Sequence, residues 1–131
     1  MLVVVIGGIA GVVCYLAVSL KFRFGYDDSL DVIGVHLVGG IIGSVLLGLF
    51  ADTAVNGNGA DGAFFGGGWS LFGEQVLAVA VTMVFSFVVT YAICLLLKVF
   101  LPGGIRVAEE DEDTGLDLAL HSETGYALAE R

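Results

Sequence analysis

Three long runs of apolar residues limit what this chain of 131 residues can fold into. They cover about residues 2–20, 29–51 and 71–101, and few charged residues interrupt them. The run from Ser29 to Ala51 is ~35 Å long as an α-helix, and a bilayer core is about 30 Å thick. Hydrophobic residues make up 57% of the chain, a share typical of membrane proteins rather than soluble domains. The sequence therefore predicts an all-α membrane protein with three transmembrane helices over these ranges.

The charged residues are concentrated at the end of the chain. The net charge is −9, and eight of the fourteen acidic residues follow Pro102. We expect the Pro-Gly-Gly sequence that starts there to end the third helix, and residues 102–131 to form an acidic tail. Because such a tail repels phosphates, nucleic acid is not an expected partner. The five consecutive acids from Glu109 to Asp113 should stay solvated unless they meet basic groups.

Basic residues predict the orientation in the membrane. Two of them lie within residues 21–28, and Lys98 and Arg106 lie around the end of the third run, whereas residues 52–70 contain no Lys or Arg. The positive-inside rule then places the 21–28 segment and the tail in the cytoplasm and the 52–70 loop outside. Three spans that start outside the cell are expected for the last piece of a longer protein rather than for a complete small one.

The second run carries one imidazole, His36, and one acid near its start, Asp31. At 100° per residue Asp31 is about 140° from His36 around a helix, so the two are not expected to pair. Asp31 should instead lie in the first helical turn and either cap the helix or bind the backbone of another segment. Either Asp28 or Ser29 is expected to be the N-cap.

The same rotation predicts a narrow face around His36. The residues within roughly 40° of the histidine on this basis are Ser29, Val32, Gly40, Gly43 and Leu47. Gly39 and Gly43 form a GxxxG pair, and Gly40 begins a second series of small residues. A second helix could therefore pack very closely against this span.

A single imidazole in an apolar helix has three interpretations: a hydrogen bond between helices, part of a proton or solute path, or a metal ligand. The metal is the weakest of these, since no Cys, Glu or second His lies at ligand spacing from His36. Catalytic motifs such as GxSxG and HExxH are missing, so neither an enzyme nor a cofactor is expected. Cys14 and Cys94 lie in apolar runs and are interpreted as small buried hydrophobes.

Two segments of the chain resemble one family. The stretch DDSLDVIGVHLVGGIIGSVLLGLFA is similar to the tenth transmembrane helix of the Amt/Mep/Rh ammonium transporters and its cytoplasmic lead-in. The tail IRVAEEDEDTGLDLALHSETGY is similar to the C-terminal region of the same family. The first and third runs resemble its ninth and eleventh spans. The resemblance implies the last three helices of an eleven-helix bundle that assembles as a homotrimer with one pore per subunit.

The resemblance also implies roles for individual residues. His36 matches the second of two pore histidines, Asp28 and Asp31 match acids at the cytoplasmic mouth, and Val32 matches an apolar position of the lumen. The Gly-Leu-Asp sequence that contains Gly115 and Asp117 matches a tail that docks across the cytoplasmic face. A PII-type signalling protein is the cytoplasmic partner implied. The first pore histidine, the outer binding site and the phenylalanine gate belong to upstream helices, so this chain holds half a pore.

The function implied is transport of ammonium or ammonia through a hydrophobic pore with a histidine relay. Moving a bare ammonium ion through an apolar passage carries a large desolvation cost, whereas ammonia is neutral. An imidazole can donate to and accept from ammonia and can relay a proton near neutral pH. The alternative is a membrane fragment for assembly or regulation that conducts nothing and packs through its glycines and its tail.

Overall fold

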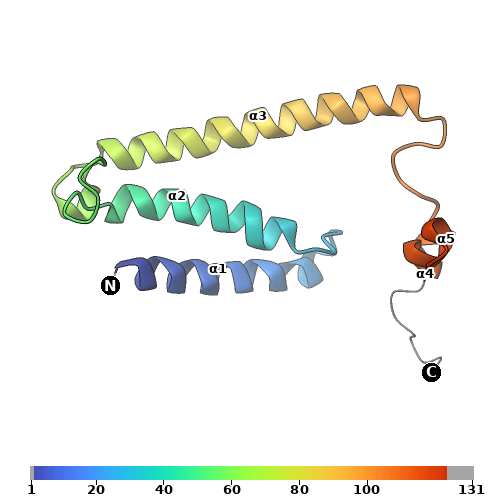
Figure 1. Ribbon diagram of the computed structural model, residues 1–131, viewed down its shortest axis with the longest axis horizontal. Coiled ribbons are helices and arrows are strands. Elements are labelled where there is room, and N and C mark those ends of the chain that lie inside the picture. Colours follow the sequence, from blue (N-terminus) through green and yellow to red (C-terminus); the bar gives the residue numbers. More distant parts are fainter. Residues whose placement is uncertain (1, 124–131) are drawn as a thin grey trace. The chain divides into compact units, whose positions relative to one another are not determined.

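The computed structural model describes residues 2–123, and all regular structure in this part of the chain is helical (Figure 1). The fold class predicted from the sequence, an all-α membrane protein, is therefore confirmed. The elements in chain order are α1 (Leu2–Phe24), the π-helical turn η1 (Val32–Leu37), α2 (Val38–Phe50), the 3₁₀ turn η2 (Ala63–Phe65), α3 (Ser70–Phe100), α4 (Glu109–Thr114) and α5 (Leu116–His121). Tyr126, which belongs to the tail segment that carries the family resemblance, lies outside the described residues.

Three helical segments between residues 2 and 123 are long and apolar enough to cross a membrane. They are Val3–Phe24, Val32–Phe50 and Ser70–Phe100. The number of spans predicted from the apolar runs is thus confirmed. At 1.5 Å per residue α3 is ~46 Å long, more than a bilayer core requires, so this helix must tilt or extend beyond the hydrocarbon.

The first helix continues beyond the apolar run, to Phe24, and so includes Lys21 and Arg23 in its last turn. Cations are favoured there because the helix dipole places negative partial charge at the C-terminus. Gly25 then has a left-handed φ of 66°, and its N–H donates to the carbonyl oxygen of Lys21 at 2.8 Å. This is the usual way in which a glycine ends a helix.

The chain divides into two compact units, Met1–Val84 and Phe85–Arg131. Within the first unit α1 lies beside η1 and α2 (Figure 1). Gly48 of α2 is buried where Phe72 of α3 approaches, since a Cβ at Gly48 would lie 2.7 Å from the Phe72 Cα. No large apolar side chain of the described residues is buried, so these helices present an extensive apolar surface.

The segment between α2 and α3 is a compact loop with its own hydrogen bonds. The Asp61 carboxylate accepts the backbone N–H of Thr53 at 2.7 Å, and this bond lowers the pKa of Asp61. Gly62 is buried and donates its N–H to Ala51 at 2.8 Å. Phe64 stands edge-to-face against Phe50, with ring centroids 5.2 Å apart. These contacts return the chain from the end of α2 towards the start of α3.

The second unit contains the acidic run, which forms α4 with four acids in its first turn. Acids are favoured at a helix N-terminus, where the dipole is positive. Arg106 makes a two-pronged ion pair with Glu112, with Nε–Oε1 and Nη2–Oε2 distances of 2.7 and 2.6 Å. One of the five consecutive acids, Glu112, therefore meets a basic group. The Arg106 guanidinium lowers the pKa of Glu112.

Candidate functional site

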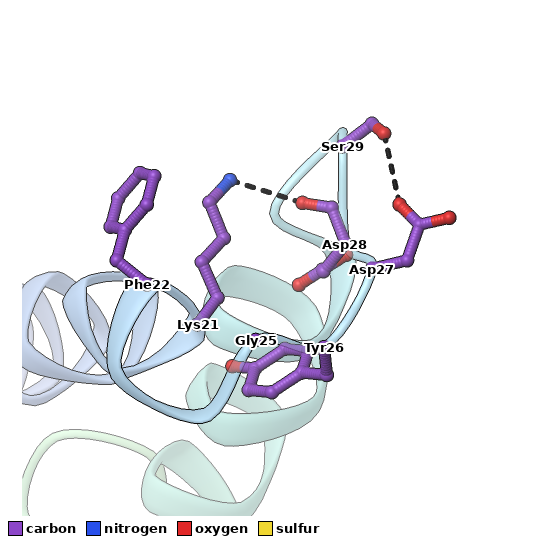
Figure 2. Close-up of a pocket in the computed structure, with 7 residues that line it drawn as sticks. All are labelled: Lys21, Phe22, Gly25, Tyr26, Asp27, Asp28 and Ser29. Atoms are coloured by element: carbon purple, nitrogen blue, oxygen red, sulfur yellow. Dashed lines mark hydrogen bonds between the residues drawn. The ribbon is translucent and has the colours of Figure 1, made fainter. Parts of the chain in front are cut away.

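The candidate site lies where the chain turns from α1 into η1. An open hollow of ≈ 450 Å³ occurs here, lined by Lys21, Phe22, Gly25, Tyr26, Asp27, Asp28 and Ser29 (Figure 2). Lys21 extends towards the main chain of Asp28, and its Nζ donates to the Asp28 carbonyl oxygen at 3.1 Å (Figure 2). The same Nζ lies 5.3 Å from the centre of the Phe22 ring. The last turn of α1 is therefore tied to the segment that leads into the second span.

Asp28 caps the second span with its side chain. Its two carboxylate oxygens accept the backbone N–H groups of Val32 at 2.8 Å and Ile33 at 2.9 Å. These are donors of the first turn, which have no partner within the helix. Of the two residues expected as N-cap, Asp28 binds this turn, whereas the Ser29 hydroxyl donates to Asp27 at 3.2 Å. The Asp28 charge is thus directed at the positive end of the helix.

Asp31 occupies a different position from the one expected. It precedes the first turn with a left-handed backbone, φ 56° and ψ 29°, and its side chain makes no capping hydrogen bond. Its carboxylate instead forms an ion pair with Lys21 of α1. Asp31 thus occupies the N-cap position rather than the first turn, and the expectation that its side chain caps the helix or binds the backbone of another segment is wrong, because the left-handed backbone directs the carboxylate to Lys21.

The span begins with a turn that is wider than an α-helical one. The N–H of Val38 donates to the carbonyl oxygen of Ile33, five residues earlier. Such a turn holds one residue more than an α-helical turn, so 100° per residue does not apply through it. The predicted face is therefore wrong at its start: Ser29 precedes the helix, and Val32 and His36 lie in the wide turn before the regular helix that carries Gly40 and Gly43.

His36 and Val32 are both exposed in this chain, and Val32 retains 49% of its accessible surface. Asp28 and Asp31 are half-buried. The arrangement brings the two acids together with Lys21 at the start of the span and places the imidazole one turn further in. A neutral imidazole can both donate and accept a hydrogen bond, so the exposed ring can bind a small amine. Among residues 2–123 there is no cluster of three His, Cys, Asp or Glu side chains that could hold a metal.

The predicted packing glycines have different surroundings. A Cβ at Gly39 would lie 3.3 Å from the Cys14 sulfur of α1, whereas Cβ atoms at Gly40 and Gly43 would meet nothing within 4 Å. The closest approach of the second span to α1 at a glycine involves Gly34, which the GxxxG pattern did not indicate. A Cβ there would lie 2.6 Å from Val18 Cγ2 and 2.9 Å from the Val18 nitrogen. Gly34 and Gly39 are five residues apart, a spacing that fits the wide turn.

Gly115 and Asp117, predicted for the tail, lie in the second unit. Gly115 joins α4 to α5 with a left-handed φ of 97°, and its N–H donates to Asp111 at 3.0 Å. Asp117 is in the first turn of α5. The positive φ explains why glycine occurs between these two short helices.

Comparison with known proteins gives the family. The sequence model of the Ammonium Transporter Family matches residues 2–126. The chain belongs to this family. It is 49% identical over 124 residues to an ammonium transporter of Bacillus subtilis, covering 94% of this chain and 30% of that protein. A putative ammonium transporter of Methanothermobacter thermautotrophicus is 49% identical over 126 residues, covering 95% of the chain and 30% of its own length.

An ammonium transporter of Mycobacterium tuberculosis is 46% identical over 129 residues, covering 95% of the chain and 27% of that protein. This ammonium transporter family chain therefore spans about 30% of the length of the curated relatives it matches. No solved structure gave a significant match. The family is one of membrane transporters, in agreement with the three apolar helices.

Proposed function

We propose that this chain is the C-terminal part of an ammonium transporter and that His36 lines the path across the membrane. One observation supports this most directly: a member of the ammonium transporter family has an exposed imidazole within a helix long enough to span a bilayer. An ionisable side chain in such a helix is costly unless it faces a partner or a polar path. A path for ammonium or ammonia satisfies that requirement.

The chemistry of the residues around His36 suits this role. Asp28 and Asp31 lie at the cytoplasmic mouth of the span, where carboxylates favour a cation that leaves the passage, while Val32 lines the passage. Transfer of a proton from ammonium to the His36 imidazole leaves neutral ammonia, which enters apolar surroundings at much lower cost than an ion. The imidazole supplies a donor and an acceptor where water is excluded, and its two nitrogens can take up a proton and pass it on. Sodium and potassium have no proton to release and are rejected.

The assembly that we propose completes the pore with upstream helices. The chain spans 30% of its Bacillus subtilis relative, and none of its large apolar side chains is buried within the described part. Upstream helices that carry a second pore histidine, neighbouring subunits of a homotrimer and lipid would cover these surfaces. The 21–28 segment and the tail would face the cytoplasm, and residues 52–70 the outside. A PII-type signalling protein would then meet the tail around Gly115 and Asp117.

A second function has one observation in its favour. The described residues contain a single histidine in a membrane span, and the face with Gly40 and Gly43 is open. A fragment that packs against other helices for assembly or regulation, without conducting, would also use such a face. The two functions differ in whether His36 is needed for uptake.

The deciding experiment restores the missing part. The chain is expressed together with the N-terminal eight helices of a related transporter in cells that lack ammonium uptake. Uptake of labelled methylammonium is expected, with its loss in His36→Ala and its retention in His121→Ala, the matched change of the other histidine in the chain. Uptake that does not depend on His36 would instead support the assembly function.

A further inference from the structure

The wide turn that carries His36 begins at a residue with an unfavourable backbone. Asp31 has φ 56° in the left-handed region, where a residue with a Cβ is uncommon, although aspartate tolerates it better than most. Such a conformation persists only when its surroundings hold it in place. Asp31 is also directly bonded to the wide turn, because its carbonyl oxygen accepts the N–H of Val35 at 2.8 Å. A change at Asp31 is therefore transmitted to the turn.

Lys21 of α1 binds the Asp31 carboxylate. Its ammonium pairs with the Asp31 carboxylate and also donates to the Asp28 carbonyl oxygen at 3.1 Å, which accepts the Asp31 N–H at 3.2 Å as well. The Lys21 side chain is 17% exposed and that of Asp31 36%, so water screens this pair less than a surface pair. A single cation from α1 thus binds both ends of the turn from Asp28 to Asp31.

The side of the wide turn that faces α1 is restricted by close contacts. Gly34 is buried against Val18, where even a Cβ would come within 2.6 Å of Cγ2. The Cys14 sulfur lies 3.8 Å from the Val35 carbonyl oxygen. Because α1 packs against η1 at Gly34 and Val35, a change in the rotation of η1 would have to begin at its first residues. If the wide turn became an ordinary α-helical turn, which has one residue fewer, the residues before it would rotate by about 100° relative to α2. His36 lies within the turn, so its imidazole would rotate by part of that angle.

We propose that Lys21 is a positioning residue for His36: by holding Asp31 in its left-handed conformation, it fixes the wide turn and thereby the direction of the imidazole. The inference rests on the proposed function for its effect on transport. It assigns a role to α1, which contributes no residue to the predicted pore. Lys21 acts through Asp31 and η1 and does not itself touch the solute.

The test compares Lys21→Met with two other changes in the protein expressed with its upstream helices. Lys21→Arg keeps a cation, and Arg23→Met removes an exposed cation from the same helical turn. Lys21→Met should reduce the maximal rate of methylammonium uptake roughly tenfold or more, with little change in the half-saturating concentration, because misplacement of a group lowers turnover. Lys21→Arg and Arg23→Met should retain most of the uptake.

A second readout reports on the imidazole itself. The ¹⁵N NMR signals of the His36 ring in lipid bilayers, assigned by their loss in His36→Ala, should shift in Lys21→Met and not in Arg23→Met. If Lys21→Met matches Arg23→Met in uptake and in these signals, the inference is overturned and the proposed function stands. If uptake does not require His36, the proposed function fails, and the signals still decide whether Lys21 directs the ring. Should Lys21→Met not accumulate, Lys21→Gln gives the same comparison: shifted signals support the role and unchanged signals overturn it.

Discussion

Asp28 and Asp31 lie three residues apart, yet their carboxylates bind different kinds of partner. Asp28 accepts two backbone N–H groups of the wide turn, whereas Asp31 pairs with a side chain from the preceding helix. The difference comes from the backbone, which is left-handed at Asp31 and directs its carboxylate towards Lys21. Residue type and spacing alone do not distinguish two such acids, and substitutions at each should have separate effects.

At Asp28, removal of the carboxylate should weaken the start of the second span. Asp28→Ala leaves the N–H groups of Val32 and Ile33 without their acceptor, which costs about 1 kcal/mol of stability. Asp28→Asn keeps an acceptor oxygen and should lose less. Thermal unfolding of the purified protein in detergent measures both. Equal melting temperatures for Asp28→Ala and the unsubstituted protein would show that the cap contributes nothing.

At Gly34, addition of a single methyl group should be harmful. A Cβ would lie 2.9 Å from the Val18 nitrogen and 3.0 Å from its Cα, and backbone atoms cannot move aside as a flexible side chain can. Gly34→Ala is expected to destabilise the contact between α1 and η1 by about 1–3 kcal/mol. Gly40→Ala is the matched control, because a Cβ there meets nothing within 4 Å of this chain. The same unfolding measurement should separate the two variants by several degrees in Tm.

At the scale of the element, the sequence predicts the helices and caps that are set by neighbouring residues, and it does not predict the helical turn that is set by contacts with a distant segment. The spans, their approximate ends and an acid cap follow from apolar run length and from the capping preferences of Asp and Ser. The wide turn η1 does not follow, because its supports come from α1: Val18 against Gly34, and Lys21 with Asp31. The face around His36 was predicted for an unbroken α-helix and is therefore wrong where the turn widens.

The ion pair between Arg106 and Glu112 of the short helix α4 gives a pH-dependent prediction. Arg106 lowers the pKa of Glu112, so the folded carboxyl is more acidic than in the unfolded chain. Its stabilising contribution is present above the unfolded pKa and is lost as pH falls through the folded pKa. We expect the Glu112 carboxyl, followed by ¹³C NMR, to titrate at lower pH in the unsubstituted protein than in Arg106→Gln. Identical titration in the two forms would mean that the ion pair does not persist in solution.

At the scale of the whole molecule, the exposed apolar surface agrees with the shortness of the chain relative to its relatives. No large apolar side chain of the described part is buried, and the chain spans about 30% of the length of the curated relatives. In the proposed assembly, three helices that bury no core among themselves would gain stability from lipid and from upstream helices. The same account explains why a proposed pore histidine is exposed here, since its opposite wall would come from the upstream helices.

Orientation in the membrane is the property of the whole molecule that the charges predict most directly. Lys21, Arg23, Lys98 and Arg106 all flank the ends that should be cytoplasmic, whereas residues 52–70 have no Lys or Arg. With Cys14 and Cys94 replaced by alanine, Asn58→Cys should react with a membrane-impermeant maleimide in intact cells. Glu123→Cys should react only after lysis, and the protein without cysteine should not react at all. The reverse pattern would mean that the basic residues do not set the orientation, and would move Asp28 and Asp31 to the outer mouth of the proposed pore.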